Sequence, residues 1–223
     1  MMVTTDPKAR QVWRSRTRNG AALLLSTIVS ITILAAGARS EPAVTGDLAA
    51  WNEVGAAFRK LQALSGYRMR VANGQSPDMR FEVVPPAAVR MAVPAGNGSM
   101  ETITVRGQSR FRINAPGGPG QWQCQGSPSV EFPGNPAEAI QGTVQVSRGA
   151  DIVIEGSAVR TYIYTYTATA QGQTISVKTT LYVGKQTGLP RRALTSGGGG
   201  DTTIDYYDYG AKLDIQLPPC PGG

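Results

Sequence analysis

The sequence predicts an α+β fold that is mainly antiparallel β-sheet, and three observations lead to this expectation. One segment, residues 47–64, repeats apolar side chains every three or four positions, which is the period of a helix buried on one face. Almost all of the chain that follows alternates apolar and polar residues in short segments, as half-buried strands do. The 27 glycines and 15 prolines supply turns between those segments. We therefore expect about ten or eleven strands joined in consecutive hairpins.

The helix predicted at residues 47–64 has clear end signals. Asp47 is an N-cap candidate, and Arg59 and Lys60 lie towards the C-terminal end, where the helix dipole favours positive charge. We expect its apolar stripe to cover the dry face of the sheet. The stripe consists of Leu48, Trp51, Val54, Phe58, Leu61 and Leu64. A second, short helix is predicted at residues 136–141 because Asn and Pro open it and Gly follows it.

The alternating segments define the predicted strands, and residues 115–134 between two of them are expected to form a loop. The predicted strands are 67–71, 79–83, 89–93, 103–105, 111–113, 151–155, 160–170, 174–183, 190–195, 202–209 and 213–217. Fixed-period repeats are absent from the sequence, which argues against a solenoid or a propeller.

The N-terminal residues have the layout of a secretory signal peptide. A basic region precedes the uncharged stretch 21–37, and the small residues Ala36-Gly37-Ala38 follow. We expect cleavage after Ala38, with Ser40 as the second choice, and an uncleaved inner-membrane anchor is the alternative. The predicted organisation is a signal peptide at 1–38, a linker at 39–46 and a single domain at 47–220. The domain would then lie in the bacterial periplasm.

The chain carries a net charge of +7, from 22 Lys and Arg against 15 Asp and Glu. More than half of this excess lies in the first 38 residues, which hold Lys8 and four arginines against Asp6. The other basic residues are spread over several predicted strands and do not form one cluster. Nucleic-acid binding needs such a cluster, so we expect none.

Two cysteines, Cys124 and Cys220, lie 96 positions apart and in no metal-ligand spacing. In an exported protein an even number of cysteines most simply indicates a disulfide, here one that ties the C-terminal tail to the middle of the domain. Two free thiols or a mixed disulfide are the alternatives. We interpret the pair as structural.

The composition argues against catalysis. Histidine is absent, which removes every His-based triad, His metal ligand and His general base. No serine stands in a nucleophile elbow, and the aspartates at 201, 205, 208 and 214 lack the glycine and terminal glutamate of a calcium loop. We expect no enzyme activity, no catalytic residue, no cofactor and no metal.

The segments follow one another in a characteristic order. A leader and an amphipathic helix are followed by YRMRV, MRFEVVPPAAVRMAV, METITV, FRI and QW, and the chain closes with TLYVGKQTGLPRRALT and TTIDYYDYGAKLDIQLPP. This order resembles that of the bacterial outer-membrane lipoprotein carrier-like (LolA-like) superfamily. The resemblance covers residues 47–219. It implies an open half-barrel of antiparallel strands with a helical lid over an apolar cavity that accepts acyl chains. The segment 115–150 and the cysteine pair depart from the family pattern.

Nine inward-pointing apolar residues are candidates for lining that cavity, and the alternative is that they fill an ordinary core. The candidates are Trp51, Phe58, Met69, Phe81, Met91, Phe111, Ile175, Val177 and Leu181. A tyrosine ladder indicates either a binding face or ordinary strand residues. It comprises Tyr162, Tyr164, Tyr166, Tyr206, Tyr207 and Tyr209.

The predicted function is that of a non-enzymatic periplasmic carrier that holds an apolar ligand in the half-barrel. Lipid or an acylated protein is the expected partner, and contact with the membrane would be transient unless the leader stays attached. The alternative function is an envelope protein-interaction or stress-sensor module with the same fold and no lipid cargo.

Overall fold

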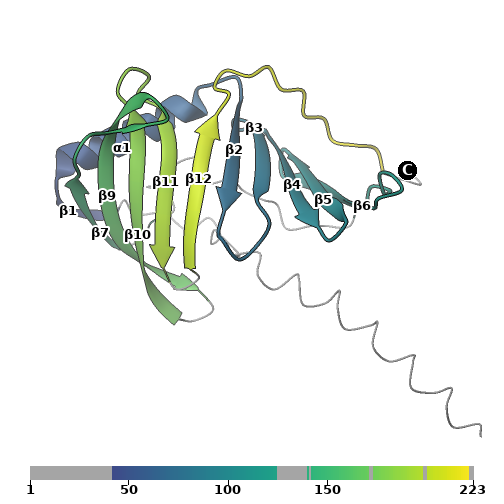
Figure 1. Ribbon diagram of the computed structural model, residues 1–223, viewed down its shortest axis with the longest axis horizontal. Helices are drawn as coiled ribbons and strands as arrows, with labels where there is room; N and C mark the ends of the chain where they lie inside the picture. Colours follow the sequence, from purple (N-terminus) through teal and green to yellow (C-terminus); the bar gives the residue numbers. More distant parts are fainter. Residues whose placement is uncertain (1–41, 125–139, 141, 171–172, 198–199, 221–223) are drawn as a thin grey trace, which may run out of the picture. The chain divides into compact units, whose positions relative to one another are not determined.

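The computed structural model describes residues 42–124, 140, 142–170, 173–197 and 200–220. They form one open, twelve-stranded sheet with a single described helix (Figure 1). The order of strands is β1-β7-β9-β10-β11-β12-β2-β3-β4-β5-β6, with β8 paired to β9. The sheet does not close on itself, so the predicted α+β class and open half-barrel are confirmed.

The strands of the sheet range from three to fourteen residues. They are β1 (Ala43–Gly46), β2 (Tyr67–Ala72), β3 (Met79–Val84), β4 (Ala88–Ala95), β5 (Gly98–Val105), β6 (Gln108–Asn114), β7 (Thr143–Arg148), β8 (Ile152–Ile154), β9 (Ser157–Ala170), β10 (Gln173–Gly184), β11 (Pro190–Gly197) and β12 (Gly200–Tyr207).

Two antiparallel meanders, β2 to β6 and β7 to β12, build the sheet. They join where β12 pairs with β2, so the expectation of hairpins throughout is wrong at this junction. The sequence analysis missed β1, which pairs in parallel with β7, and β7 itself. β7 carries the expected alternation in Val144 and Val146, both buried, but its other residues are polar.

The helix α1 (Leu48–Gln62) confirms the prediction for residues 47–64. The Asp47 carboxylate caps it by accepting a hydrogen bond from the Ala50 N–H at 2.9 Å. α1 packs against β1, β7 and β11 and lies behind the strands in Figure 1. We call the face of the sheet that α1 covers the inner face. The predicted helix at 136–141 and the leader lie outside the described residues, apart from the buried Ile140.

The C-terminal tail, residues 211–220, corrects the prediction of a last strand at 213–217. These residues pair with no strand, because β12 already has β11 and β2 as neighbours. The alternating Leu213, Ile215 and Leu217 pack instead on the outer face against Ala88 and Ile103. Period-two alternation therefore marked an extended segment correctly, but not a strand of the sheet.

The disulfide predicted between Cys124 and Cys220 is confirmed, and it fixes the end of this tail. Next to it, Gln123 pairs with Phe111, so the segment after β6 runs along the edge of the sheet. In the part of the chain that the structure describes, no helix is long and apolar enough to cross a membrane.

Candidate functional site

The inner face carries two adjacent rows of side chains that run across six strands. In the first row the register places Tyr206, Met69, Phe81, Met91, Thr102 and Phe111 opposite one another, from β12 to β6. The second row contains Ile204, Val71, Met79, Val93, Met100 and Ile113. Directly opposite residues are in side-chain contact distance, so the rows form a continuous, largely apolar surface.

The structure places all nine predicted cavity residues on the inner face or on the helix side that faces it. Five of them belong to the buried core: Trp51, Phe58, Met69, Phe81 and Leu181. Met91 is half-buried against that core, and Val177 is buried on β10. Phe111 and Ile175 are half-buried, at opposite ends of the surface.

Beneath α1 the inner face is closely packed with aromatic rings. Trp51 meets Tyr164 edge-on at 5.7 Å between ring centres, and Phe58 meets Tyr206 in the same way at 6.4 Å. Burial raises the pKa of Tyr67 to about 12 and raises that of Tyr164 as well. Most of the tyrosine ladder is thus part of the core under the helix.

The other half of the inner face, over β4 to β6, is less buried. Met91, Met100 and Phe111 are half-buried, and Ile113 is 58% exposed. Three small hydroxyl residues, Thr102, Thr104 and Ser109, are buried among them, and Thr104 and Ser109 share a hydrogen bond of 2.8 Å. Adaptable methionines beside a few polar groups are the usual lining of a site for variable apolar ligands.

A polar contact fixes α1 to the sheet at the β7–β9 side. The Glu53 carboxylate accepts hydrogen bonds from Arg148 at 2.8 and 2.9 Å and from the Tyr162 hydroxyl, and Arg160 lies 3.5 Å away. Burial and the bond to Glu53 raise the pKa of Tyr162. Sequence reasoning missed this contact, because Glu53 and its partners lie 95 to 109 positions apart.

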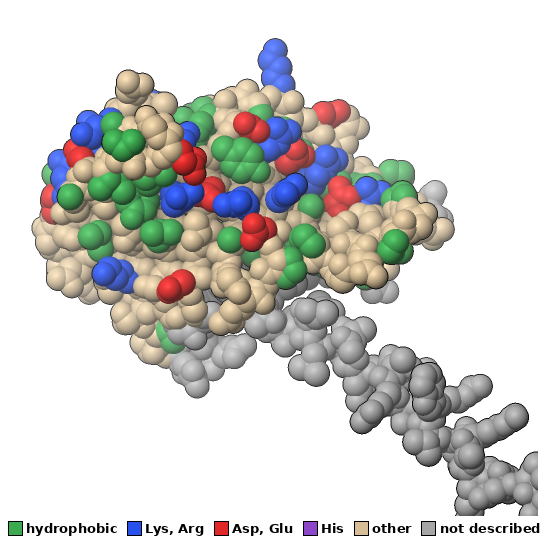
Figure 2. Space-filling model, viewed as in Figure 1, with side chains coloured by type: hydrophobic (Ala, Val, Ile, Leu, Met, Phe, Trp, Pro, Cys, Tyr) green, Lys and Arg blue, Asp and Glu red, His purple; other side chains and the backbone are tan. Residues whose placement is uncertain are grey.

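The outer face is charged (Figure 2). One series of ion pairs crosses five strands in the order Arg68, Glu82, Arg90, Glu101 and Arg112, and Arg112 lies over the Trp122 ring. The hydrogen bonds that Arg68 donates to Asp208 and Glu82 raise its pKa. The aspartates considered as a cation site belong to this surface: Asp205 pairs with Arg70 and Arg192, and Asp208 with Arg68.

Solved structures with the same architecture exist, although no protein-family model and no curated protein sequence matches the chain. The crystal structure of lipoprotein LppX from Mycobacterium tuberculosis matches 77% of this chain and all of its own, with a TM-score of 0.59 and 12% identity. LprF from Mycobacterium bovis matches 80% of this chain and 99% of its own, with a TM-score of 0.55 and 15% identity.

These likenesses define the class of protein at the level of the fold. The chain has the LolA-like fold that the sequence predicted. At 12% and 15% identity, the comparison carries the architecture and nothing about the ligand.

Proposed function

We propose that the protein is a non-enzymatic carrier-like protein of the bacterial periplasm, which holds lipid or the acyl chain of an acylated protein on its inner face. One observation carries the proposal: α1 covers only part of the apolar surface of the inner face. α1 packs against β1, β7 and β11, while the apolar rows continue to β6 and end in half-buried or exposed side chains. Acyl chains bind to such surfaces through the hydrophobic effect.

Entry of a chain would start at the half over β4 to β6 and extend under α1 when the helix shifts. Trp51, Phe58 and Leu181, which belong to the core beneath α1, would then contact the ligand. The contact of Glu53 with Arg148, Arg160 and Tyr162 opposes this shift. Glu53 and the two arginines are partly exposed, so their ion pairs contribute little, and binding of a long acyl chain can exceed this contribution.

A matched pair of variants tests the proposal. Both are made in a protein of residues 39–223, because the described core and the disulfide lie within residues 42–220. Ile113→Asp places a charge at the exposed end of the inner face. Leu194→Asp is the control and places a charge on the outer face, where Leu194 is also an exposed apolar side chain. We expect Ile113→Asp to weaken the binding of a fluorescent fatty acid at least tenfold, and Leu194→Asp to leave it unchanged. Equal affinity in both variants would contradict inner-face binding.

A protein-interaction module is the second candidate function, and the filled core beneath α1 favours it. Val54, Val144 and Leu181 are fully buried there, as in a domain with no internal ligand. Such a module would take up no fatty acid while remaining folded and disulfide-bonded. The fatty-acid titration of the unchanged protein therefore separates the two candidates.

A further inference from the structure

The outer face contains a hollow of about 400 Å³ on the side opposite to α1. Four arginines from three strands line it: Arg70 on β2, Arg80 on β3, and Arg191 and Arg192 on β11. Two carboxylates, those of Glu155 and Asp205, face them. Positive charge remains in excess even when Asp78, 3.8 Å from Arg70, is included.

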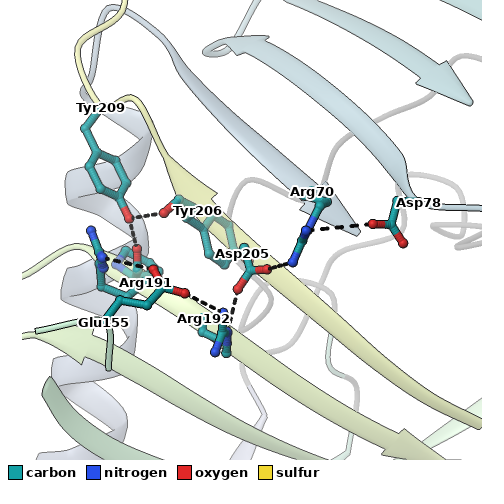
Figure 3. A network of polar contacts seen from close by, with 9 residues as sticks. Arg70, Asp78, Glu155, Arg191, Arg192, Asp205, Tyr206 and Tyr209 are labelled. Atoms are coloured by element: carbon teal, nitrogen blue, oxygen red, sulfur yellow. Dashed lines mark hydrogen bonds and ion pairs between the residues drawn. The ribbon is translucent and has the colours of Figure 1, made fainter. Parts of the chain in front are cut away.

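Three of these arginines, Arg70, Arg191 and Arg192, have carboxylate partners, as Figure 3 shows. Asp205 lies between Arg192 at 2.5 Å and Arg70 at 2.9 Å, and Arg191 reaches the largely exposed Glu155 only at 3.7 Å. Arg80 makes no ion pair or hydrogen bond with any residue that the structure describes. The cationic groups of the hollow are therefore incompletely neutralised.

The register shows that Arg80 is out of place in an otherwise alternating pattern. Arg192, Asp205 and Arg70 face one another on β11, β12 and β2 with alternating sign, and the next position, on β3, should hold an acid. It holds Arg80 directly opposite Arg70. Like charges in opposite positions destabilise a sheet. The pair of Arg70 and Arg80 is explained if both side chains bind the same anion.

An apolar hairpin stands beside the hollow. β8 and β9 are joined by the two-residue turn Glu155-Gly156, in which both residues have positive φ, 48° and 75°. Ile154 of this hairpin lines the hollow, and Ile152, which lies on the same face of β8, is 41% exposed. Exposed β-branched side chains next to arginines suit the boundary between lipid headgroups and acyl chains.

We propose that the hollow and the β8–β9 hairpin dock the protein on an anionic membrane surface. Arg80, with Arg70 and Arg191, would bind the phosphate of a lipid headgroup, and Ile152 and Ile154 would enter the upper acyl region. Guanidinium groups bind phosphate through paired hydrogen bonds, and the anionic surface attracts each uncompensated arginine. This docking site is independent of the apolar surface on the inner face.

Vesicle sedimentation with residues 39–223 tests the proposal. The protein should bind vesicles that contain phosphatidylglycerol, bind pure phosphatidylcholine weakly, and be released as salt increases. Arg80→Ser should weaken binding about fivefold, since one cation is lost. Ile152→Ser should weaken it roughly three- to tenfold, since an apolar side chain that enters the acyl region is lost.

Two matched control variants remove an arginine and an exposed apolar side chain outside the hollow and the β8–β9 hairpin. Arg106→Asn removes a charge from the β5–β6 turn, and Leu48→Ser removes an exposed apolar side chain at the start of α1. Both should bind vesicles like the unchanged protein. Equal losses in the controls, or no vesicle binding, would overturn the proposal.

A further experiment tests whether the hollow binds a lipid headgroup or a free anion. Soluble glycerol phosphate and inorganic phosphate are titrated against the protein and against Ile152→Ser. Tight binding of either anion, together with full vesicle binding by Ile152→Ser, would reassign the hollow to a soluble ligand and overturn membrane docking. Binding of a fatty acid to the inner face is measured separately and does not depend on this outcome.

Discussion

The two halves of the sheet are covered on opposite faces. Over β7 to β12 and β2, α1 packs on the inner face, and the outer face of β11, β12 and β2 carries ion pairs. Over β3 to β6, the tail at 211–220 packs on the outer face, and the inner face ends in half-buried methionines and the exposed Ile113. Each half thus needs only one covering element to bury a core.

This difference explains how part of an apolar surface stays accessible in a stable fold. On the outer face, Ile215 and its neighbours add buried contacts to the β3–β6 half beyond those of Phe81 and Val89 on the inner face, and the disulfide holds that tail in place. The inner face of the β3–β6 half therefore contributes less to the stability of the fold than the inner face under α1. A surface that stability does not require is available for a ligand.

The largest expected effect comes from removing the disulfide. Cys124→Ser with Cys220→Ser should lower the free energy of unfolding by about 2–5 kcal/mol, because the bridge closes a loop with a separation of 96 residues. Urea unfolding measures the loss. Hydrogen exchange should increase first in β4 and β5, over which the tail packs. Uniform acceleration that includes β9 and β10 would contradict the independent support of the two halves.

Two methionines on the inner face compare the halves directly. Met69→Ala, at a side chain 1% exposed under α1, should lower the free energy of unfolding by about 2–5 kcal/mol. Met100→Ala, at a half-buried position on β5, should lower it by about 1 kcal/mol and weaken fatty-acid binding more than it weakens the fold. Similar losses of stability at both positions would show that the two halves are equally packed.

Alkaline pH tests the packed half through Tyr67. Its pKa is near 10 in the unfolded chain and about 12 when buried, so the folded state keeps the proton longer. Below pH 10 the raised pKa of Tyr67 does not reduce the stability of the folded state. As the pH rises from 10 to 12, the free energy of unfolding falls by up to about 2–3 kcal/mol, because the unfolded chain loses the Tyr67 proton first. Tyr67→Phe should therefore show a smaller fall in the free energy of unfolding over this range. Identical pH profiles would mean that Tyr67 is not buried in solution.

The smallest expected effect concerns the contact that holds α1. Glu53→Gln should lower the free energy of unfolding by about 1 kcal/mol or less and speed the uptake of a fluorescent fatty acid. Glu101→Gln is the matched control, because Glu101 also pairs with two arginines but lies in the other half. Faster uptake in both variants, or in neither, would argue against a shift of α1.

The sequence contained the local structure but not the arrangement of distant parts. Alternation located Tyr67, Met69 and Val71 on one face, and their register in the sheet confirmed it. It could not show that β12 pairs with β2, since pairing of distant strands leaves no trace in local periodicity. For the same reason the extended segment around Ile215 was assigned to the sheet.

The candidate site was predictable only in its residue types. Sequence reasoning placed Met69 and Met91 together as inward residues, but it could not distinguish the buried one from the half-buried one, because burial depends on where α1 and the tail pack. The contact of Glu53 with Tyr162 and the position of Arg80 opposite Arg70 likewise appear only when strands are aligned.

Native mass spectrometry of residues 39–223, purified from the periplasm under mild conditions, tests the central claim most directly. A bound mass that organic extraction identifies as lipid is the predicted result, and it would name the class of ligand on the inner face. A ligand-free, disulfide-bonded protein that also refuses added lipid would contradict the claim and favour the interaction module.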